Sequence, residues 1–135
     1  MTFQPCQERE LLMIIGIGCD IIEIARIEAA VQKDSFVKRV FTEAEALYCL
    51  SRGKNAAASF AARFAAKEAA LKALGTGLRD GRLREIEIRN NALGRPELCL
   101  SGAFAELASN LGVKRTHLSL SHGRSEAIAY VVMED

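Results

Sequence analysis

The sequence has almost no excess of charge of either sign. Lysine and arginine total 18 against 17 aspartate and glutamate residues, which gives a formal net charge of +1 at pH 7. General nucleic-acid binding needs a strong positive field, because clustered lysine and arginine must meet the phosphate backbone. The composition therefore argues against a nucleic-acid partner, and any charged partner must be met by a local patch.

Cysteine pairs with metal-binding spacing are also missing. The four cysteines, Cys6, Cys19, Cys49 and Cys99, are scattered and include no CxxC pair. Neither a zinc site nor a disulfide framework is indicated by this spacing. Reduced thiols are the simplest interpretation, and they predict a cytoplasmic protein.

No apolar run reaches the length that spans a membrane, so no membrane partner is expected. The opening MTFQPCQERE is polar and lacks the charged-then-apolar order of a secretory signal. We expect residues 1–12 to be a flexible extension, with regular structure beginning at Met13. Half of the 135 residues are apolar, so the remainder, 13–135, is long enough to form one domain with its own core.

The segment IIGIGCDII, at 14–22, alternates like a strand. Gly16, Gly18 and Asp20 share one face, and isoleucines with Cys19 occupy the other. Two glycines on one face weaken a strand unless another backbone or a ligand comes close there. We therefore expect the glycine face, with Asp20 on it, to form a wall of a site.

The rest of the chain mixes helices and strands. Apolar spacing predicts helices at 23–32, 42–53, 55–74 and 101–112, with Asp34 and Ser35 as a break and a capping box formed by Thr42 and Glu45. Alternation predicts a hairpin at 83–89 and 97–100, and two final strands at 117–121 and 126–132. Hairpins imply antiparallel pairing. The predicted class is therefore α+β, with an antiparallel sheet packed against one long Ala-rich helix and shorter flanking helices.

In the long helix, Phe60, Phe64, Glu68 and Lys72 fall four residues apart and therefore share one stripe. Taken alone, Glu68 and Lys72 are a solvated ion pair worth about 0.3–0.5 kcal/mol. Asp20 taken alone is an ordinary acid at a strand end. Neither signal by itself points to a function.

Taken together, Asp20 and Glu68 suggest a metal site. Two converging carboxylates can hold Mg²⁺, which prefers oxygen ligands, and leave positions open for phosphate oxygens and water. Lys67 and Lys72 can neutralise the charge that builds up on a phosphoryl group. The combination therefore favours phosphate chemistry.

Two segments carry a family likeness: GIGCDIIEIARIE, at 16–28, and FAAKEAALKALGTG, at 64–77. They strongly resemble the two signature segments of the holo-acyl-carrier-protein synthases, the small trimeric branch of the phosphopantetheinyl transferase superfamily. Their order and separation match as well. The likeness runs from about Met13 to the C-terminus and includes the Gly94-Arg95-Pro96 turn and the late segment SLSHGRSEAIAYVV.

The resemblance implies a role for particular residues. Asp20 and Glu68 match the metal-binding positions, Lys72 the phosphate lysine, and Lys67 its neighbour. Further positions match those near coenzyme A in the family: Gly75, Thr76, Gly77, Arg95, Pro96, Ser121 and His122. Arg26 matches a basic residue that meets the acidic carrier protein, and Lys33 and Arg39 are expected on the same surface, although an ordinary wet helix face explains such charges equally well.

The resemblance also implies the reaction. Phosphopantetheine would pass from coenzyme A to a serine of apo acyl carrier protein, with Mg²⁺ as cofactor and adenosine 3′,5′-bisphosphate as leaving product, in fatty acid biosynthesis. A homotrimer is implied, with coenzyme A contacted by two chains at each subunit boundary. Where double-length relatives place a third acid, this chain has Ile22, so a two-carboxylate site with water in that position is expected.

Two points stay open at the level of the sequence. Glu68 can accept the serine proton directly or through a water. For His122, a role as nucleotide contact or bystander is preferred to a role as general base. Two other functions compete with the transferase: a non-catalytic module that docks an acidic partner, and a metal-dependent nucleotide hydrolase. The first needs no metal, and the second needs no acceptor protein.

Overall fold

The computed structural model describes residues 13–77 and 81–135, so the prediction for residues 1–12 falls outside the described residues. In the following order, η marks a short 3₁₀ helix. The elements are β1 (Ile14–Glu23), α1 (Ile24–Ala30), α2 (Asp34–Val40), α3 (Glu43–Leu50), η2 (Gly53–Asn55), α4 (Ala56–Leu74), η3 (Leu83–Glu85), β2 (Ile86–Asn90), β3 (Pro96–Leu100), α5 (Gly102–Leu111), β4 (Arg115–His122) and β5 (Glu126–Glu134).

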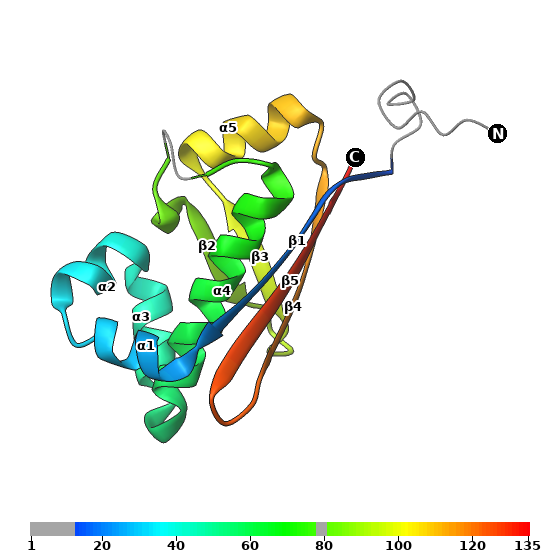
Figure 1. Cartoon of the computed structure of the whole chain (residues 1–135). Helices are drawn as coiled ribbons and strands as arrows, with labels where there is room; N and C mark the ends of the chain where they lie inside the picture. Colours follow the sequence, from blue (N-terminus) through cyan, green and yellow to red (C-terminus); the bar gives the residue numbers. More distant parts are fainter. Residues whose placement is uncertain (1–12, 78–80) are drawn as a thin grey trace.

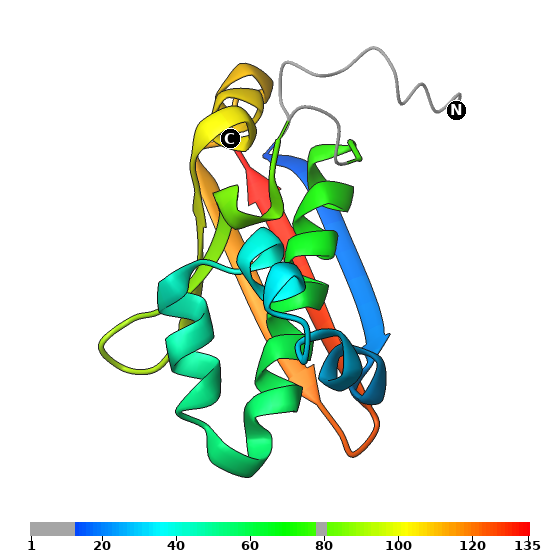
Figure 2. The same cartoon turned by 90° about the vertical axis from the view of Figure 1, so that its left-hand side faces the viewer.

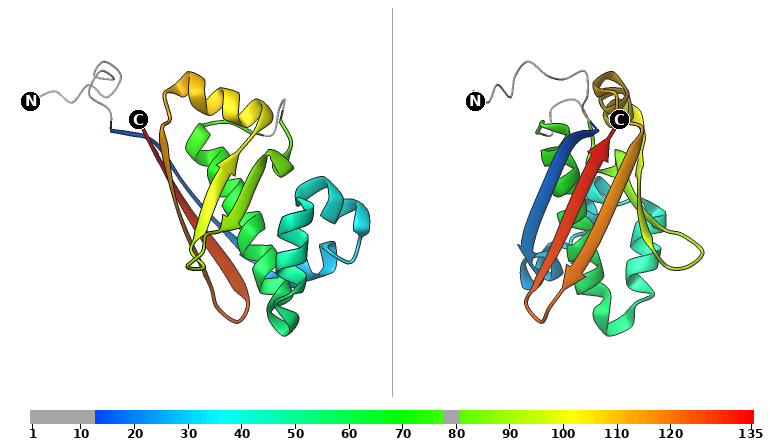
Figure 3. Two further views of the ribbon diagram at one scale, coloured as in Figure 1. Left: turned by 180° about the vertical axis from the view of Figure 1, so that it is seen from behind. Right: turned by 90° about the vertical axis from the view of Figure 1, so that its right-hand side faces the viewer.

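The strands form two antiparallel sheets. The larger has the order β1-β5-β4, and the smaller pairs β2 with β3. Helix α4 crosses one face of the larger sheet, and α1, α2 and α3 gather at one side of α4 (Figure 1). The opposite face of that sheet is covered by no other described element (Figure 3, right). The predicted α+β class, with an antiparallel sheet against a long helix, is confirmed.

Helix α4 is the centre of the core. Most of its residues are buried, and alanines supply the positions that face the sheet. It begins after Asn55, as predicted, but the Asn55 side chain makes no capping hydrogen bond. It ends at Gly75, whose φ of 73° is the left-handed conformation that favours glycine. No helix in the two described ranges is both long enough and apolar enough to cross a membrane.

Strand β1 touches the backbone of α4 at two glycines. A Cβ atom on Gly16 would lie 1.9 Å from the carbonyl oxygen of Ala73, and one on Gly18 would lie 1.8 Å from that of Ala69. Two strand residues and four helix residues both advance about 6 Å, so the glycines meet successive turns of the helix. The close approach predicted for this face is therefore made by a helix backbone.

The helices at the side of α4 agree closely with the prediction from the sequence, except at Asp34. Thr42 and Glu45 form the predicted capping box: the Thr42 hydroxyl accepts from the Glu45 amide at 3.2 Å, and the Thr42 amide donates to Glu45 Oε1 at 2.9 Å. Asp34 does not break the helical pattern but begins α2, where an acid in the first turn is favourable. Phe36 of α2 packs on Phe64 of α4 at a centroid separation of 6.2 Å.

The chain between α4 and α5 differs from the prediction at Leu83–Glu85, which form a 3₁₀ turn before the strand. Glu85 explains the difference. Its Oε1 accepts from the Arg82 amide at 2.7 Å, which closes the turn, and its Oε2 accepts from the Ala103 amide at 3.1 Å. Glu85 therefore satisfies the start of α5, where Ser101 makes no side-chain capping bond.

A buried ion pair joins α3, α4 and β2. The amine of Lys67 donates to Glu45 Oε1 at 2.8 Å and to the carbonyl oxygens of Leu83 and Ile86 at 3.0 and 2.7 Å, and both charged side chains are 0% exposed. Glu45 Oε2 accepts from the Ile88 amide at 3.0 Å. All three donors of the ammonium group are satisfied, which a buried charge requires. Burial lowers the pKa of Lys67, and the charge of Glu45 opposes that shift.

We expect Gly18→Ala to destabilise the protein by about 3 kcal/mol, near the top of the usual range for overpacking, because the added methyl group overlaps a helix carbonyl that cannot move without shifting α4. Urea unfolding followed by circular dichroism measures the change. Gly123→Ala is the matched control, since a Cβ there meets nothing within 4 Å. Equal stability of the two variants would contradict the close packing of β1 on α4.

Candidate active site

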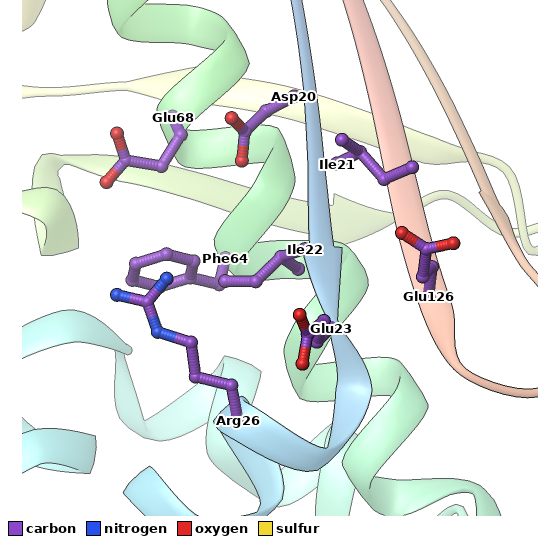
Figure 4. Close-up of a pocket in the computed structure, with 8 residues that line it drawn as sticks. All are labelled: Asp20, Ile21, Ile22, Glu23, Arg26, Phe64, Glu68 and Glu126. Carbon is purple, nitrogen blue, oxygen red and sulfur yellow. The ribbon is translucent and has the colours of Figure 1, made fainter.

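A pocket of about 540 Å³ opens where β1, α1 and α4 meet. Its lining residues are Asp20, Ile21, Ile22, Glu23, Arg26, Phe64, Glu68 and Glu126. Figure 4 shows the carboxylates of Asp20, from β1, and Glu68, from α4, facing the same part of the pocket. Arg26 and Phe64 line the same pocket. The structure therefore brings together the two acids that the sequence analysis selected.

The position of Asp20 follows from the glycines. Gly16, Gly18 and Asp20 alternate along one face of β1, and the two glycines fix that face against the α4 backbone. Asp20 is the next residue on this face after the two glycines. Its carboxylate therefore emerges beside the helix. Glu68 precedes Ala69, the residue that meets Gly18, and is half-buried.

Lys72 lies next to the acids. Its amine is 3.2 Å from Asp20 Oδ1 and donates to the carbonyl oxygen of Cys19 at 2.9 Å. The Lys72 side chain is 57% exposed, whereas the Asp20 side chain is 20% exposed. Its charge offsets that of Asp20 while the amine keeps access to solvent. Lys72 is therefore placed to contact an anion that enters the pocket.

The electrostatics of the acids favour a cation between them. Burial raises the pKa of the Glu68 carboxyl, and the negative charge of Asp20 raises it further, while Lys72 and Arg26 oppose the shift. A carboxylate beside another carboxylate in a partly dry site is relieved when a positive ion binds both. The donor set, made of carboxylate oxygens, suits a hard divalent cation such as Mg²⁺.

The described residues hold no cluster of three or more His, Cys, Asp or Glu side chains arranged for a metal. Ile22, which stands where larger relatives were expected to have a third acid, is 7% exposed and packs into the core. The local donor set is thus limited to two carboxylates. Water or substrate oxygens would have to complete the coordination of an ion here.

Lys67 is not brought to this pocket. It follows Phe64 and precedes Glu68 on α4, but it points to the other side of the helix, where its amine is enclosed by Glu45 and two carbonyl oxygens. The amine has no exposed surface with which to meet a phosphate. In this structure the residue serves packing, and the expectation that it lies beside the phosphates has no support in the geometry.

Three other predicted residues meet in a second, smaller pocket of about 230 Å³. Pro96, Ser121 and His122 are brought together there, at the ends of β3 and β4. The full lining is Tyr48, Arg52, Asn55, Ser59, Ala62, Arg63, Asn90, Pro96, Leu120, Ser121 and His122. It shares no residue with the pocket of Asp20 and Glu68. The predicted site residues of one chain therefore fall into separate pockets.

Arg63 is a residue of this second pocket that sequence reasoning missed. It is 4% exposed, its guanidinium stacks on the Tyr48 ring at 4.2 Å, and Nη2 donates to Asn90 Oδ1. Its Nε has no hydrogen-bond partner within the described part of the chain. The available signal was an arginine among alanines on a buried helix, since such a charge is rare without a partner.

The remaining predicted residues lie apart from both pockets. Gly75 ends α4, and Thr76 and Gly77 line a cavity of about 320 Å³ against α5. Arg95 is exposed in the β2–β3 turn, where Asn91 Oδ1 accepts from its amide at 3.0 Å. Within one chain, these residues are not assembled around the two acids.

Of the predicted carrier-facing residues, Arg26 lines the pocket of the acids. Lys33 precedes α2 and is exposed, and Arg39 lies on α2 with its guanidinium 5.8 Å from the centre of the Phe36 ring. All three are on the side of the molecule formed by α1 and α2 (Figure 2). Of the three, only Arg26 lines the pocket of the acids.

Comparison with known proteins places this geometry in a family. A family model described as the 4′-phosphopantetheinyl transferase superfamily matches residues 16–131. The chain is 47% identical over 126 residues to a holo-[acyl-carrier-protein] synthase of Koribacter versatilis, covering 91% of this chain and 100% of the relative. It is 50% identical over 125 residues to one of Trichlorobacter lovleyi, covering 90% and 98%.

Solved structures agree with the sequence relatives. A holo-[acyl-carrier-protein] synthase from Neisseria meningitidis has a TM-score of 0.82 at 38% identity, covering 91% of this chain and 100% of that chain. One from Bacillus anthracis in complex with CoA (3′,5′-ADP) has a TM-score of 0.75 at 40% identity, covering 90% and 97%. The chain therefore belongs to the 4′-phosphopantetheinyl transferase superfamily and, within it, to the holo-acyl-carrier-protein synthases. It is an enzyme, a phosphopantetheinyl transferase.

The raised pKa of Glu68 generates a prediction that needs no substrate. We expect the Glu68 carboxyl, followed by carbon-detected NMR without metal, to titrate above the ordinary glutamate value, and Asp20→Asn to lower its midpoint by removing the neighbouring charge. In the unaltered protein, Mg²⁺ affinity should fall as the pH drops through the Glu68 midpoint, because a metal ligand must be deprotonated. Glu126→Gln is the control, and an unchanged Glu68 midpoint in Asp20→Asn would contradict the coupling.

Proposed function

We propose that this chain transfers phosphopantetheine from coenzyme A to a serine hydroxyl of an acidic apo acyl carrier protein. The observation that carries the proposal is the shared pocket of Asp20 and Glu68, with Lys72 beside them. Support also comes from the relatives named as holo-[acyl-carrier-protein] synthases, and from solved relatives in complex with coenzyme A, from Bacillus anthracis and Helicobacter pylori.

Asp20 and Glu68 are the residues proposed to hold Mg²⁺. Both offer carboxylate oxygens, and the unfavourable closeness of their charges, which raises the Glu68 pKa, would be relieved by the ion. Bound there, Mg²⁺ would orient the pyrophosphate of coenzyme A and offset negative charge on the phosphoryl oxygens. Ile22 leaves the rest of the coordination shell to water and substrate.

The proposed step forms one bond and breaks one. The serine oxygen of the carrier attacks the β-phosphorus of coenzyme A, and the bond from that phosphorus to the bridging oxygen breaks. Adenosine 3′,5′-bisphosphate leaves with the electron pair of that bond. Lys72, whose amine remains exposed, is positioned to stabilise the charge on the phosphates. Glu68 accepts the serine proton directly or through a water, and its raised pKa suits it to that role.

The nucleotide end of coenzyme A is proposed to bind in the second pocket, lined by Pro96, Ser121 and His122. Arg52 and Arg63 line it as well and supply positive charge for a phosphate. The unpartnered Nε of the buried Arg63 supports this assignment, because a buried donor without a partner is costly unless a ligand satisfies it. The loop of Gly75, Thr76 and Gly77, and Arg95, complete the proposed coenzyme contacts.

We propose that the enzyme is a homotrimer in which one chain supplies the metal pocket and a neighbour the nucleotide pocket. Two observations support it: the predicted site residues of one chain fall into pockets without a common residue, and the open sheet face carries large apolar side chains. Ile17 and Ile21 of β1 and Tyr130 of β5 are 69%, 57% and 53% exposed. Such an exposed apolar patch is typical of a subunit interface.

The free thiols of Cys19, Cys49 and Cys99 fit a proposed cytoplasmic location.

Removal of either acid should abolish transfer without unfolding the protein. We expect Asp20→Asn and Glu68→Gln each to lower the transfer rate by about 10²-fold or more, because each loses half of the local metal donors. Mass spectrometry of an apo carrier incubated with coenzyme A and Mg²⁺ measures the product, and circular dichroism checks the fold. Glu126→Gln, at the far end of the same pocket, is the matched control and should keep most activity.

The same assay separates the competing functions. A non-catalytic docking module would bind the carrier equally well in chelator and leave its mass unchanged. A nucleotide hydrolase would release adenosine 3′,5′-bisphosphate from coenzyme A with no carrier present. Full transfer by Glu68→Gln would remove that residue from the proposed metal site.

The trimer is tested at the open sheet face. We expect Ile17→Glu to give a monomer in analytical ultracentrifugation and to lose transfer, because a charge would be buried at the interface. Leu47→Glu is the matched control: Leu47 is 70% exposed, but it lies on α3 and not on the sheet. A monomeric, fully active Ile17→Glu variant would contradict an active site shared between subunits.

A further inference from the structure

A groove of about 410 Å³ lies between α2 and the chain that leads into β2. Its lining residues are Lys38, Arg39, Val40, Gly81, Arg82, Leu83 and Arg84. We call it the basic groove, because Lys38, Arg39, Arg82 and Arg84 line it and no acid does. It shares no residue with the pocket of Asp20 and Glu68.

Among the described residues, only Lys38 of the four lining cations forms a side-chain ion pair. The carboxylate of Glu85 is turned to the amides of Arg82 and Ala103, which it caps. Asp34 pairs with Lys38 at 2.9 Å, on an exposed helix surface where such a pair contributes little. Among the described residues, neither Arg82 nor Arg84 forms a side-chain ion pair. The described lining of the groove therefore carries three cations without an ion pair, Arg39, Arg82 and Arg84, although the whole chain is nearly neutral.

The floor of the groove is apolar. Val40 and Leu83 line it and are 3% and 8% exposed, whereas Arg39, Arg82 and Arg84 are exposed around them. Cations around an apolar floor match a partner that offers acidic side chains next to an aliphatic one. An acidic amphipathic helix has that pattern. A phosphate alone would leave the floor unused.

The basic groove adjoins the active site through stacked side chains. The Arg39 guanidinium lies 5.8 Å from the centre of the Phe36 ring, and Phe36 packs on Phe64, which lines the pocket of the acids. Helices α1 and α2 and the turn before β2 lie on one side of the molecule (Figures 1 and 2). A protein docked against Arg26 is therefore within reach of the groove without leaving that side.

We infer that the basic groove is a second contact for the acidic carrier protein, and that Arg82 and Arg84 recognise an acidic helix of the carrier. This inference rests on the proposed function and extends the carrier surface beyond Arg26, Lys33 and Arg39. Rim charges of this kind speed the encounter and fix orientation more than they hold the final complex. The groove would thus guide the carrier so that its serine reaches the pocket.

The test measures carrier and coenzyme A dependence separately. For the Arg82→Ala/Arg84→Ala variant we expect the KM for the carrier to rise about tenfold, from loss of two complementary charges, with the KM for coenzyme A and kcat at saturating carrier unchanged. Added salt should raise the carrier KM less steeply in the variant than in the unaltered protein. Lys114→Ala is the control for the single variant Arg84→Ala. It removes one exposed cation just before β4 and should leave the KM for the carrier unchanged.

Each outcome bears on the inference. An unchanged carrier KM in the double variant would overturn it, and a raised KM for coenzyme A with an unchanged carrier KM would assign the groove to the coenzyme instead. Calorimetric titration of the carrier without coenzyme A should show the same weakening as the kinetics. Failure of the unaltered protein to modify any carrier would contradict the proposed function itself, and with it this inference, before a variant is compared.

Discussion

Strand β1 and helix α4 are joined by a direct backbone contact, which positions the other elements of the fold. Gly16 and Gly18 lie so close to the carbonyl oxygens of Ala73 and Ala69 that no side chain fits between them. Because the contact is made by backbone on both sides, it fixes the height and rotation of the strand on the helix. The acid that follows on the same strand face is thereby delivered beside Glu68.

Neighbouring residues of α4 have opposite surroundings because a helix turns about 100° per residue. Lys67 points into the protein, where Glu45 and two carbonyl oxygens satisfy all its donors, and it ties three elements together. Glu68 points into the pocket, where burial and Asp20 raise its pKa. One side chain stabilises the fold, and the next retains an unfavourable charge that a bound cation would relieve. An unfavourable charge of this kind is common at functional sites.

The predicted site residues are not confined to this one pocket. The acids and Lys72 are together, but Pro96, Ser121 and His122 lie in another pocket with Arg63, and an apolar sheet face stays open to solvent. The proposed site shared between subunits would account for both observations. The basic groove adds a third region, on the side of α1 and α2, whose charge is local in a chain of net charge +1. In the proposed scheme, catalysis and partner binding are divided among separate surfaces.

The α+β class, the positions of most helices and strands and the capping box at Thr42 could be predicted from the sequence, because period, turn residues and local hydrogen bonds are encoded over short stretches. The convergence of Asp20 and Glu68 was a hypothesis from their residue types and from the family resemblance, since no short stretch contains both. The 3₁₀ turn at 83–85, where the Glu85 side chain caps two elements, was not predicted. The burial of Lys67 and the place of Arg63 in a pocket depend on tertiary packing, since the surroundings of a side chain on an Ala-rich helix are set by which faces other elements cover. Alanine is small on every side of α4, so its pattern does not distinguish those faces, and packing alone does.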